Sequence, residues 1–339
     1  MTLKQSSVRV VAMKSQKTKP KVISTFSGCG GSSLGYHLAG YDVLLAVEMD
    51  NNAVETYKAN FPKTKIYHGD IHNLTVEKTL ELTNLKIGEL DLLDGSPPCQ
   101  GFSMAGSREF CDPKNQLYNE YVRLLKGLQP KTFVMENVKG LITGNMKLIF
   151  KDMLTQLKAC GYDVQVKLMN AMYYNCATSR QRVIFIGVRK DLGITATHPK
   201  PQTKPITVKQ CLQGHKSKYG PRYPKNRKIL YLMDKVNPGE LFSKYSIKYF
   251  NHNTFREVYK VDINKPLPTI KRGSYTQFIL NHRYMEPDET ALCQSFPKNF
   301  KWIGSPNQQA ERIGNSVPPN LMKAIAAHIK ENILEKIDN

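Results

Sequence analysis

Up to about Arg189, the chain alternates short apolar segments with segments of helical periodicity, and this alternation limits the possible folds more than any other feature. One helical pattern consists of Tyr118, Tyr121, Val122 and Leu125. Short apolar strands joined by helices form a mostly parallel sheet with both faces covered. We therefore predict an α/β fold. The expected strands lie at residues 22–26, 43–47, 66–67, 90–93, 132–135 and 183–188.

The pattern changes after Arg189, where prolines at positions 199, 201, 205, 221, 224 and 238 interrupt any periodicity. A length of 339 residues also favours two domains. After Pro319 a helical run returns, which predicts that the chain end packs back onto the first domain; its expected inner face carries Leu321, Ile325, His328 and Ile329. We predict a disordered basic arm at 1–21, a first domain at 22–188 plus 305–339, and a smaller, loop-rich domain at 189–304.

The charge balance indicates a polyanionic partner. The chain has 49 Lys and Arg against 28 Asp and Glu, a formal net charge of +21. Between His198 and Lys228 there are nine basic residues and no acid, with Tyr219 and Tyr223 among them. Such a tract is typical of a surface that follows nucleic-acid phosphates, with a solvated basic surface as the alternative.

Other compositional features exclude several protein classes. No apolar run approaches the roughly 20 residues that span a bilayer. The first 21 residues are polar and basic, unlike a signal peptide. Seven cysteines without a CxxC pair argue against a disulfide or zinc scaffold and fit a reducing compartment. We therefore expect a cytoplasmic protein.

Polar residues follow three consecutive expected strands. Residues 27–31 form a glycine turn that opens a helix, Glu48 ends the second strand, and Asp70 follows the third. Ligands of parallel sheets bind beyond the carboxyl ends of the strands, and an acid after the second strand typically binds ribose hydroxyls. A structural turn and solvated loop acids explain each feature alone. Together the three features predict a site for an adenosine-bearing ligand.

A candidate nucleophile, Cys99, follows the fourth strand. The prolines at 97–98 rigidify the chain before it, and the strand end directs its sulfur into the same crevice. A free thiol needs help to ionise at neutral pH, which Arg180 and Arg182 can supply because they point the same way at strand spacing. Glu136 ends the fifth strand and can hold a proton on a substrate nitrogen. A buried core role for the cysteine and a capping role for the acid are the ordinary alternatives.

The segment 96–103, Ser-Pro-Pro-Cys-Gln-Gly-Phe-Ser, resembles the signature of the cytosine-C5 DNA methyltransferases of bacterial restriction-modification systems. The resemblance covers most of residues 22–335 in the order of the family. It implies a Rossmann-like S-adenosylmethionine-dependent methyltransferase sheet and a smaller target-recognition domain that reads DNA at about 189–271. The other matching motifs are Phe26 to Gly31, Glu48-Met49, Asp70-Ile71, Glu136-Asn137-Val138, Arg180-x-Arg182 and Gly314-Asn315-Ser316-Val317-Pro318.

The resemblance also implies roles for individual residues. Cys99 would attack C6 of a flipped-out cytosine, Glu136 would contact N3 and the amino group, and Arg182 would contact O2 with support from Arg180. The loop at 101–116 would be a lid. No metal is required. The implied cofactor-binding residues are Phe26, Gly28, Cys29, Gly30, Gly31, Glu48, Met49, Asp70, Ile71, Pro98, Leu117, Asn315 and Ser316, with Cys29 facing the cofactor. The candidates for DNA binding are Gln100, Ser103, Lys200, Lys216, Lys218, Arg222, Arg227, Lys228, Arg272 and Arg283.

The implied cofactor is S-adenosylmethionine, which leaves as S-adenosylhomocysteine, and the implied partner is double-stranded DNA. A separately encoded restriction endonuclease can accompany such an enzyme, and we expect a monomer that acts at the nucleoid of a bacterium or its phage. Thr178 replaces the usual Gln of the arginine motif, Asp288 replaces an Arg, and Lys114 replaces another Arg. A tRNA cytosine-C5 methyltransferase shares the core, but its Cys-Phe-Thr tripeptide is absent after residue 98. A DNA-binding regulator without turnover is a further alternative, which the intact catalytic motifs oppose.

Overall fold

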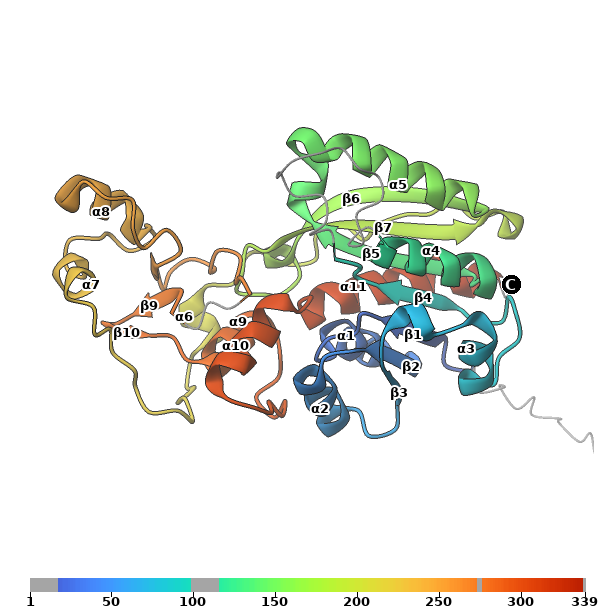
Figure 1. Cartoon of the computed structure of the whole chain (residues 1–339), viewed down its shortest axis with the longest axis horizontal. Coiled ribbons are helices and arrows are strands. Elements are labelled where there is room, and N and C mark those ends of the chain that lie inside the picture. The colour runs from blue at the N-terminus through green and yellow to red at the C-terminus, as the bar shows by residue number, and fades with distance from the viewer. Residues whose placement is uncertain (1–17, 99–115, 273–275, 338–339) are drawn as a thin grey trace, which may run out of the picture.

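A computed structural model describes residues 18–98, 116–272 and 276–337 (Figure 1). Most of the N-terminal arm lies outside these residues, as do Cys99, Gln100, Ser103, Lys114 and nearly all of the expected lid. What we predict for those residues therefore stays a prediction.

A seven-stranded sheet forms the centre of the molecule, in the order β3-β2-β1-β4-β5-β7-β6 (Figure 1). The first five strands of the chain pair in parallel, which confirms the α/β prediction. The strand β7 is antiparallel to both β5 and β6 because a short connection, rather than a crossover helix, joins β6 to β7. The strands are β1 (Lys21–Thr25), β2 (Asp42–Glu48), β3 (Lys65–His68), β4 (Leu92–Gly95), β5 (Thr132–Val138), β6 (Tyr162–Asn170) and β7 (Gln181–Arg189).

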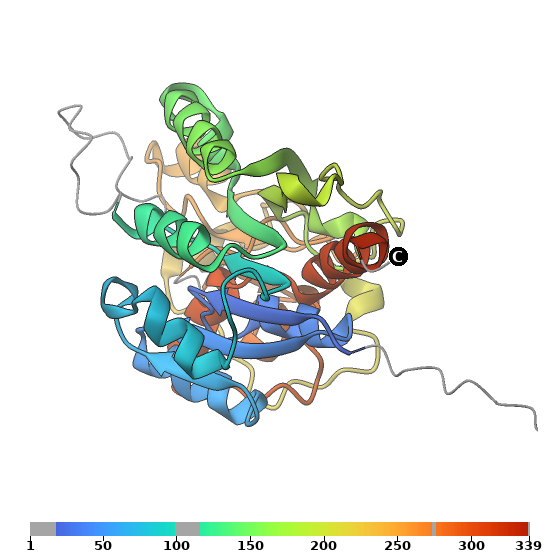
Figure 2. The same cartoon turned by 90° about the vertical axis from the view of Figure 1, so that its right-hand side faces the viewer.

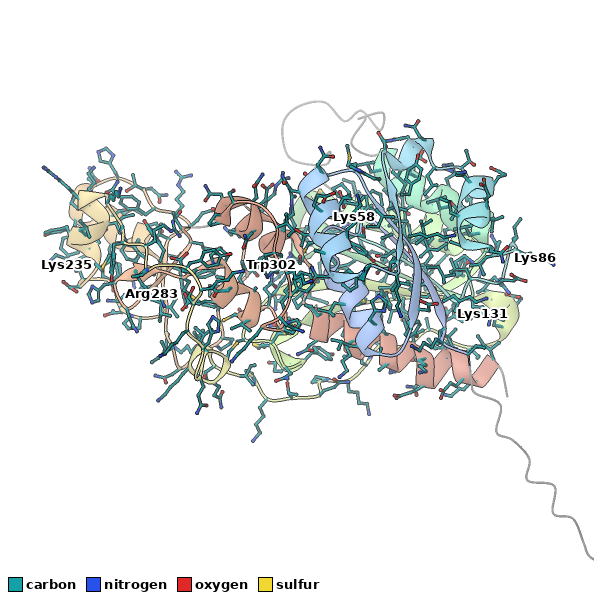
Figure 3. All side chains as sticks on the ribbon, turned by 90° about the horizontal axis from the view of Figure 1, so that it is seen from below. Lys58, Lys86, Lys131, Lys235, Arg283 and Trp302 are labelled. Carbon is teal, nitrogen blue, oxygen red and sulfur yellow. The ribbon has the colours of Figure 1, made fainter. Side chains whose placement is uncertain are left out.

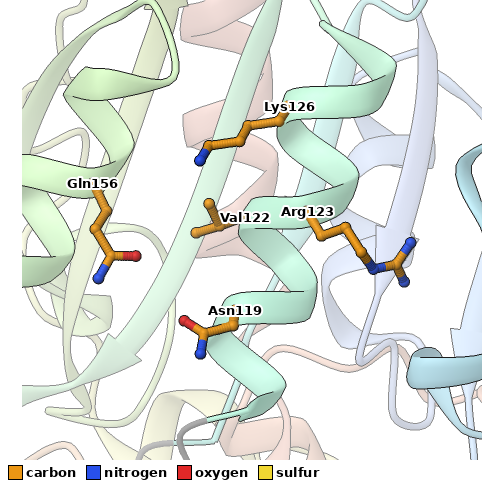
Figure 4. Close-up of a pocket in the computed structure, with 5 residues that line it drawn as sticks. All are labelled: Asn119, Val122, Arg123, Lys126 and Gln156. Carbon is orange, nitrogen blue, oxygen red and sulfur yellow. The ribbon is translucent and has the colours of Figure 1, made fainter. Parts of the chain in front are cut away.

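Helices cover both faces of this sheet, so the inner strands β1, β4, β5 and β7 are buried, whereas the edge strands β3 and β6 are partly exposed. On one face lie α3 (Val76–Thr83), α4 (Gln116–Leu128) and α5 (Lys147–Ala159), and on the other lie α1 (Gly31–Leu38) and α11 (Pro319–Ile329) (Figure 2). A pocket of about 370 Å³ lies between α4 and α5, lined by Asn119, Val122, Arg123, Lys126 and Gln156 (Figure 4). It belongs to the helical layer and not to the strand ends.

The chain end packs back onto the first domain, as the sequence predicts. On α11, Leu321, Ile325 and Ile329 are fully buried in the core that covers Val22 of β1. A Cβ atom on Gly35 of α1 would lie 2.6 Å from the Cβ of Met322, so a larger residue would push the two helices apart. The short helix α12 (Glu335–Ile337) ends the described chain.

An outer lobe, defined here as residues 212–292, extends away from the sheet (Figures 1 and 3). Its own core contains Ile229, Leu232, Phe242, Val258 and Ile279. Figure 3 labels Lys235 and Arg283 in this lobe, far from Lys86 and Lys131 at the other end of the molecule. The lobe contains α7 (Arg227–Leu232), α8 (Phe242–Phe250) and the three-stranded sheet β10-β9-β8, formed by β8 (Tyr259–Lys260), β9 (Phe278–Leu280) and β10 (Arg283–Tyr284).

A third core joins the lobe to the sheet. Phe296, Phe300 and Trp302 contact one another with ring centroids 4.8–4.9 Å apart, and Phe300 reaches Phe61 at the end of α2 with a centroid distance of 6.3 Å. The expected domain boundary at 304/305 therefore falls next to a core that both parts share. The helices here are α2 (Asn51–Asn60), α6 (Val208–Cys211), α9 (Pro287–Cys293) and α10 (Pro306–Asn315). No helix in the described part of the chain is both long and apolar enough to cross a membrane.

Candidate active site

The glycine turn after β1 is held from two sides. Phe26 has a φ of 53°, and Gly28 has the same value, so the chain turns sharply through the left-handed region. A Cβ atom on Gly31 would lie 2.5 Å from the carbonyl oxygen of Val317, which only glycine avoids without a shift of backbone. The turn therefore presents backbone N–H groups at the beginning of α1, where the sequence predicts a ligand.

The carboxylate of Glu48 organises the end of β2. Its Oε2 accepts a hydrogen bond from the backbone N–H of Gly28 at 2.8 Å, and its Oε1 accepts two from Met49 and Asp50 at 2.9 Å. The Met49 side chain beside it is 64% exposed. An exposed apolar side chain next to a fixed carboxylate suits a ligand with an aromatic face and hydroxyl groups.

Asp70 follows β3 at the same edge of the sheet. Its Oδ1 accepts hydrogen bonds from the backbone N–H of His72 at 3.0 Å and from the Nδ1 of His72 at 2.6 Å. These bonds lower the pKa of Asp70, so its carboxylate stays ionised at neutral pH. Ile71 next to it is buried and packs into the core.

Cys29 differs from the expectation that it faces a cofactor. Its thiol is buried, with the Sγ 3.0 Å from the Oγ of Ser316, and burial raises its pKa to about 11. Cys29 thus joins the glycine turn to the motif at 314–318. Arg312, which the sequence does not single out, adds a second link through an ion pair with Asp50 at 2.7 Å. No sequence signal marks this pair because it forms only when α10 reaches α2.

Glu136 and Arg182 are brought together at the ends of β5 and β7. Their Oε1 and Nε atoms lie 2.6 Å apart, and the two side chains are 9% and 10% exposed. The Nδ2 of Asn137 donates to the carbonyl oxygen of Pro97 at 3.2 Å, which fixes the Pro-Pro segment beside this ion pair. Pro98 is exposed, and Leu117 is half-buried across the gap between the described segments.

Arg180 does not share the surroundings of Arg182. Its Nη1 donates to the carbonyl oxygen of Ile270 at 2.7 Å, and its Nη2 lies 3.5 Å from that of Asn315. Burial and the charge of Arg182 lower the pKa of this guanidinium. Arg180 precedes the first residue of β7, so the alternation within a strand does not govern its direction. It holds the outer lobe and α10 against the sheet.

Sequence reasoning missed the buried acid Asp94. Its Oδ2 accepts a hydrogen bond from the Oγ of Ser24 at 2.8 Å, and its Oδ1 accepts one from the hydroxyl of Tyr36 at 3.0 Å. Burial raises its pKa to about 7. The position gave no signal because an acid inside an apolar strand is read as a strand end. It ties β4 to β1 and α1 beneath the Pro-Pro segment.

The basic residues singled out for DNA contact fall into two groups. Lys200, Lys216, Lys218, Arg227 and Lys228 are exposed, as a phosphate-binding surface requires. The remaining three arginines have protein partners. Arg222 stacks on Tyr284 with its guanidinium carbon 4.8 Å from the ring centroid, and Arg272 pairs with Glu311 at 2.8 Å. Arg283 pairs with Glu289 through its Nη1 at 2.7 Å and its Nη2 at 2.6 Å.

Two departures from the family pattern have structural partners. Asp288 accepts hydrogen bonds from the Oγ of Ser217 at 2.8 Å and the backbone N–H of Lys218 at 3.0 Å, so it holds the basic tract against α9. Thr178 pairs with Leu267 and donates from its Oγ1 to the carbonyl oxygen of Pro268 at 3.2 Å. Thr178 therefore connects the outer lobe to the segment before β7, whereas Asp288 joins the segments by which the chain enters and leaves the lobe.

The chain is similar to known proteins over nearly its whole length. The profile of the C-5 cytosine-specific DNA methylases matches residues 20–331. The sequence is 34% identical to the type II methyltransferase M.NgoPII of Neisseria gonorrhoeae, over 92% of this chain and 96% of that protein. It is 35% identical to the type II methyltransferase M1.HphI of Haemophilus parahaemolyticus, over 92% and 87%. A solved structure of a prophage-encoded E. coli protein, described as a DNA modification methyltransferase, aligns with a TM-score of 0.73, 28% identity, and coverage of 93% of this chain and 100% of that one.

Proposed function

This chain belongs to the C-5 cytosine-specific DNA methylase family, and we propose that it transfers the methyl group of S-adenosylmethionine to C5 of cytosine within a specific sequence of duplex DNA. It is a DNA cytosine-5-methyltransferase of the restriction-modification type. The observation that carries this proposal is the ion pair of Glu136 and Arg182 beside Pro97. It places a carboxylate and a guanidinium where the Pro-Pro-Cys segment begins.

The residues at the ends of β1, β2 and β3 fit S-adenosylmethionine, which supplies an electrophilic methyl group bound to a sulfonium. Glu48 would accept hydrogen bonds from the ribose hydroxyls, and Asp70 would accept one from the adenine amino group. The exposed Met49 side chain would contact the adenine ring, and Ile71, whose side chain is buried, would contact it through its backbone. An ionised Asp70 supports this role, since only the acceptor form suits an amino group.

The base chemistry falls to Cys99, Glu136 and Arg182. The Cys99 thiolate bonds to C6 of cytosine and pushes electron density onto C5, which makes C5 nucleophilic. Glu136 holds a proton on N3 and accepts from the exocyclic amino group, which selects cytosine over thymine. Arg182 donates to O2. After methylation, a water or hydroxide from the solvent takes the C5 proton, the C5–C6 double bond forms again, and the C6–S bond breaks, which releases the thiolate.

Access to the base and recognition of the sequence complete the proposal. The target cytosine leaves the duplex, because C6 is out of reach inside it. The outer lobe, with the segment leading into it from residue 189, contacts phosphates for affinity and base edges for specificity. We further propose that the enzyme is monomeric and cytoplasmic, and that a separately encoded endonuclease recognises the same DNA sequence.

A transfer assay tests the function as a whole. We expect tritium from labelled S-adenosylmethionine to appear as 5-methylcytosine in duplex DNA and not in total tRNA. Label in tRNA alone would favour the tRNA alternative, and no label in either substrate, together with tight DNA binding, would favour a regulator without turnover.

The first prediction concerns cofactor affinity. Glu48→Ala should raise the dissociation constant for S-adenosylmethionine about tenfold or more, since a charge-assisted hydrogen bond contributes ~1.5–3 kcal/mol. Calorimetry measures this. Glu55→Ala is the matched control, because Glu55 lies on α2 in an exposed pair with Lys58 at 3.3 Å. An unchanged affinity in Glu48→Ala would reduce Glu48 to a structural residue of the loop.

The second prediction concerns the exposed basic residues. Replacing Lys200, Lys216, Lys218, Arg227 and Lys228 by glutamine should weaken DNA binding and flatten its salt dependence by roughly one unit of slope for each phosphate that the variant no longer neutralises. The control replaces Lys63 and Lys86, which come before β3 and β4, on the side of the amino-terminal ends of these strands. If both variants keep the wild-type slope, the tract is a solvated surface.

A further inference from the structure

Two cysteines meet where the outer lobe joins its base. The helix α6 ends at Cys211, the helix α9 ends at Cys293, and the two helices are in contact. Cys293 is fully buried in the core that joins the lobe to the sheet, and the half-buried Cys211 packs against the same core. Because the two helices are in contact and each thiol also shifts the pKa of the other, the two side chains lie close together.

Their surroundings make the two thiols unequal. The hydrogen bond from Cys293 and the charge of Lys298 lower the pKa of Cys211, whereas that bond and burial raise the pKa of Cys293. Among the other cysteines that the structure describes, burial raises the pKa of Cys29 to about 11 and that of Cys176 to about 12. A half-buried thiol with a lowered pKa, beside a buried partner, is the arrangement that favours selective oxidation.

The position of the pair gives the bond between them a structural consequence. The chain enters the outer lobe directly after α6 and leaves it along α9, and these helices lie side by side at the base of the lobe (Figure 1). Asp288 of α9 already holds Ser217 and Lys218 on the entering segment. A covalent link here would close the lobe into one loop at its base.

We propose that Cys211 and Cys293 form a dithiol that peroxide oxidises to a disulfide across the base of the outer lobe. The Cys211 thiolate attacks one peroxide oxygen, the O–O bond breaks, and hydroxide leaves as Cys211 becomes a sulfenic acid. The sulfur of Cys293 then attacks the sulfur of Cys211, the S–O bond breaks, and water leaves with the thiol proton. In sum, two thiols are oxidised and one hydrogen peroxide is reduced to two waters.

Peptide mapping of the full-length enzyme tests the proposal. The reduced protein is treated with one equivalent of hydrogen peroxide, its remaining thiols are alkylated, and it is digested without reductant. We expect a peptide that links Cys211 to Cys293, and a rise of the unfolding temperature by several degrees that dithiothreitol reverses, because the link restricts the unfolded chain.

Single variants separate the two steps. In Cys293→Ser the sulfenic acid at Cys211 should persist and be captured by dimedone, and Cys293→Ala serves if serine disturbs the core. In Cys211→Ser, Cys293 should stay reduced. Cys160→Ser is the matched control and should form the disulfide like wild type. Two outcomes would overturn the proposal. In the first, Cys211 is still reduced after peroxide has oxidised other thiols. In the second, Cys211 is linked to a different cysteine. Methyl transfer is assayed with reductant present, so its outcome is independent.

Discussion

Cys99→Ala is expected to abolish methyl transfer, lowering the turnover by several orders of magnitude as the loss of a covalent nucleophile does, while S-adenosylmethionine still binds with wild-type affinity. The reason is the low reactivity of C5 in free cytosine, which only bond formation at C6 overcomes. Transfer of tritium to duplex DNA measures the loss, and calorimetry measures cofactor binding. Cys99→Ser should fail too, because a hydroxyl is scarcely ionised at neutral pH.

A trapped intermediate makes the test of Cys99 direct. With 5-fluorocytosine at the target, C5 carries fluorine, which cannot leave as a cation after methylation. The enzyme should stay bonded to the DNA and give a cofactor-dependent shifted band on a denaturing gel. Cys99→Ala should give no band. Cys160→Ala should give the wild-type band, because Cys160 follows α5 and is buried in the core between the helices and the sheet.

The other described cysteines are poor substitutes for Cys99. Burial raises the pKa of Cys29, Cys160 and Cys176, so none of them supplies a thiolate at neutral pH. Cys211 ionises more readily but lies at the base of the outer lobe, after α6. A persistent adduct in Cys99→Ala would therefore falsify the assignment of the nucleophile.

The central sheet and the ligand end of its strands were predictable from the sequence. The inner parallel strands are largely buried, so each reads as an apolar run, and its end reads as the first polar residue or glycine. Glu48 and Glu136 stood out for this reason, and Asp70 stood out as the acid after the short third strand. The antiparallel strand β6 was missed because its exposed alternate residues, Gln165 and Lys167, interrupt any apolar run.

Partners that meet only through tertiary structure were not predictable. Arg180 and Arg182 are two residues apart, yet Arg180 donates to carbonyl groups of the outer lobe and α10, whereas Arg182 pairs with Glu136. Arg283 reads as a basic residue free for DNA, but Glu289 faces it from the next helix. In each case the sequence shows the residue type and its position near a strand end. The direction of the side chain depends on another element of the fold that packs against it.

Arg180→Ala is expected to destabilise the whole enzyme by about 3–5 kcal/mol, because it removes a large, fully buried side chain and leaves the carbonyl group of the buried Ile270 without its donor. The residue is 2% exposed, and its guanidinium reaches the carbonyl oxygens of Ile270 and Asn315. Denaturant unfolding measures the change. Arg272→Ala is the matched control, since Arg272 lies at the same joint in an exposed pair with Glu311, and such pairs contribute only ~0–1 kcal/mol.

Kinetics separate this positioning role from a direct contact with the base. Arg180→Lys keeps one hydrogen-bond donor. Relative to Arg180→Ala, stability and methyl transfer should therefore recover together, because both depend on the contact of the outer lobe and α10 with the sheet. Asn315 belongs to the motif at 314–318 beside the glycine turn. In Arg180→Ala the Michaelis constant for S-adenosylmethionine should therefore rise and the turnover should fall, and Arg180→Lys should reverse part of both changes. A variant with wild-type unfolding and wild-type cofactor affinity, but without turnover, would show instead that Arg180 acts on the cytosine.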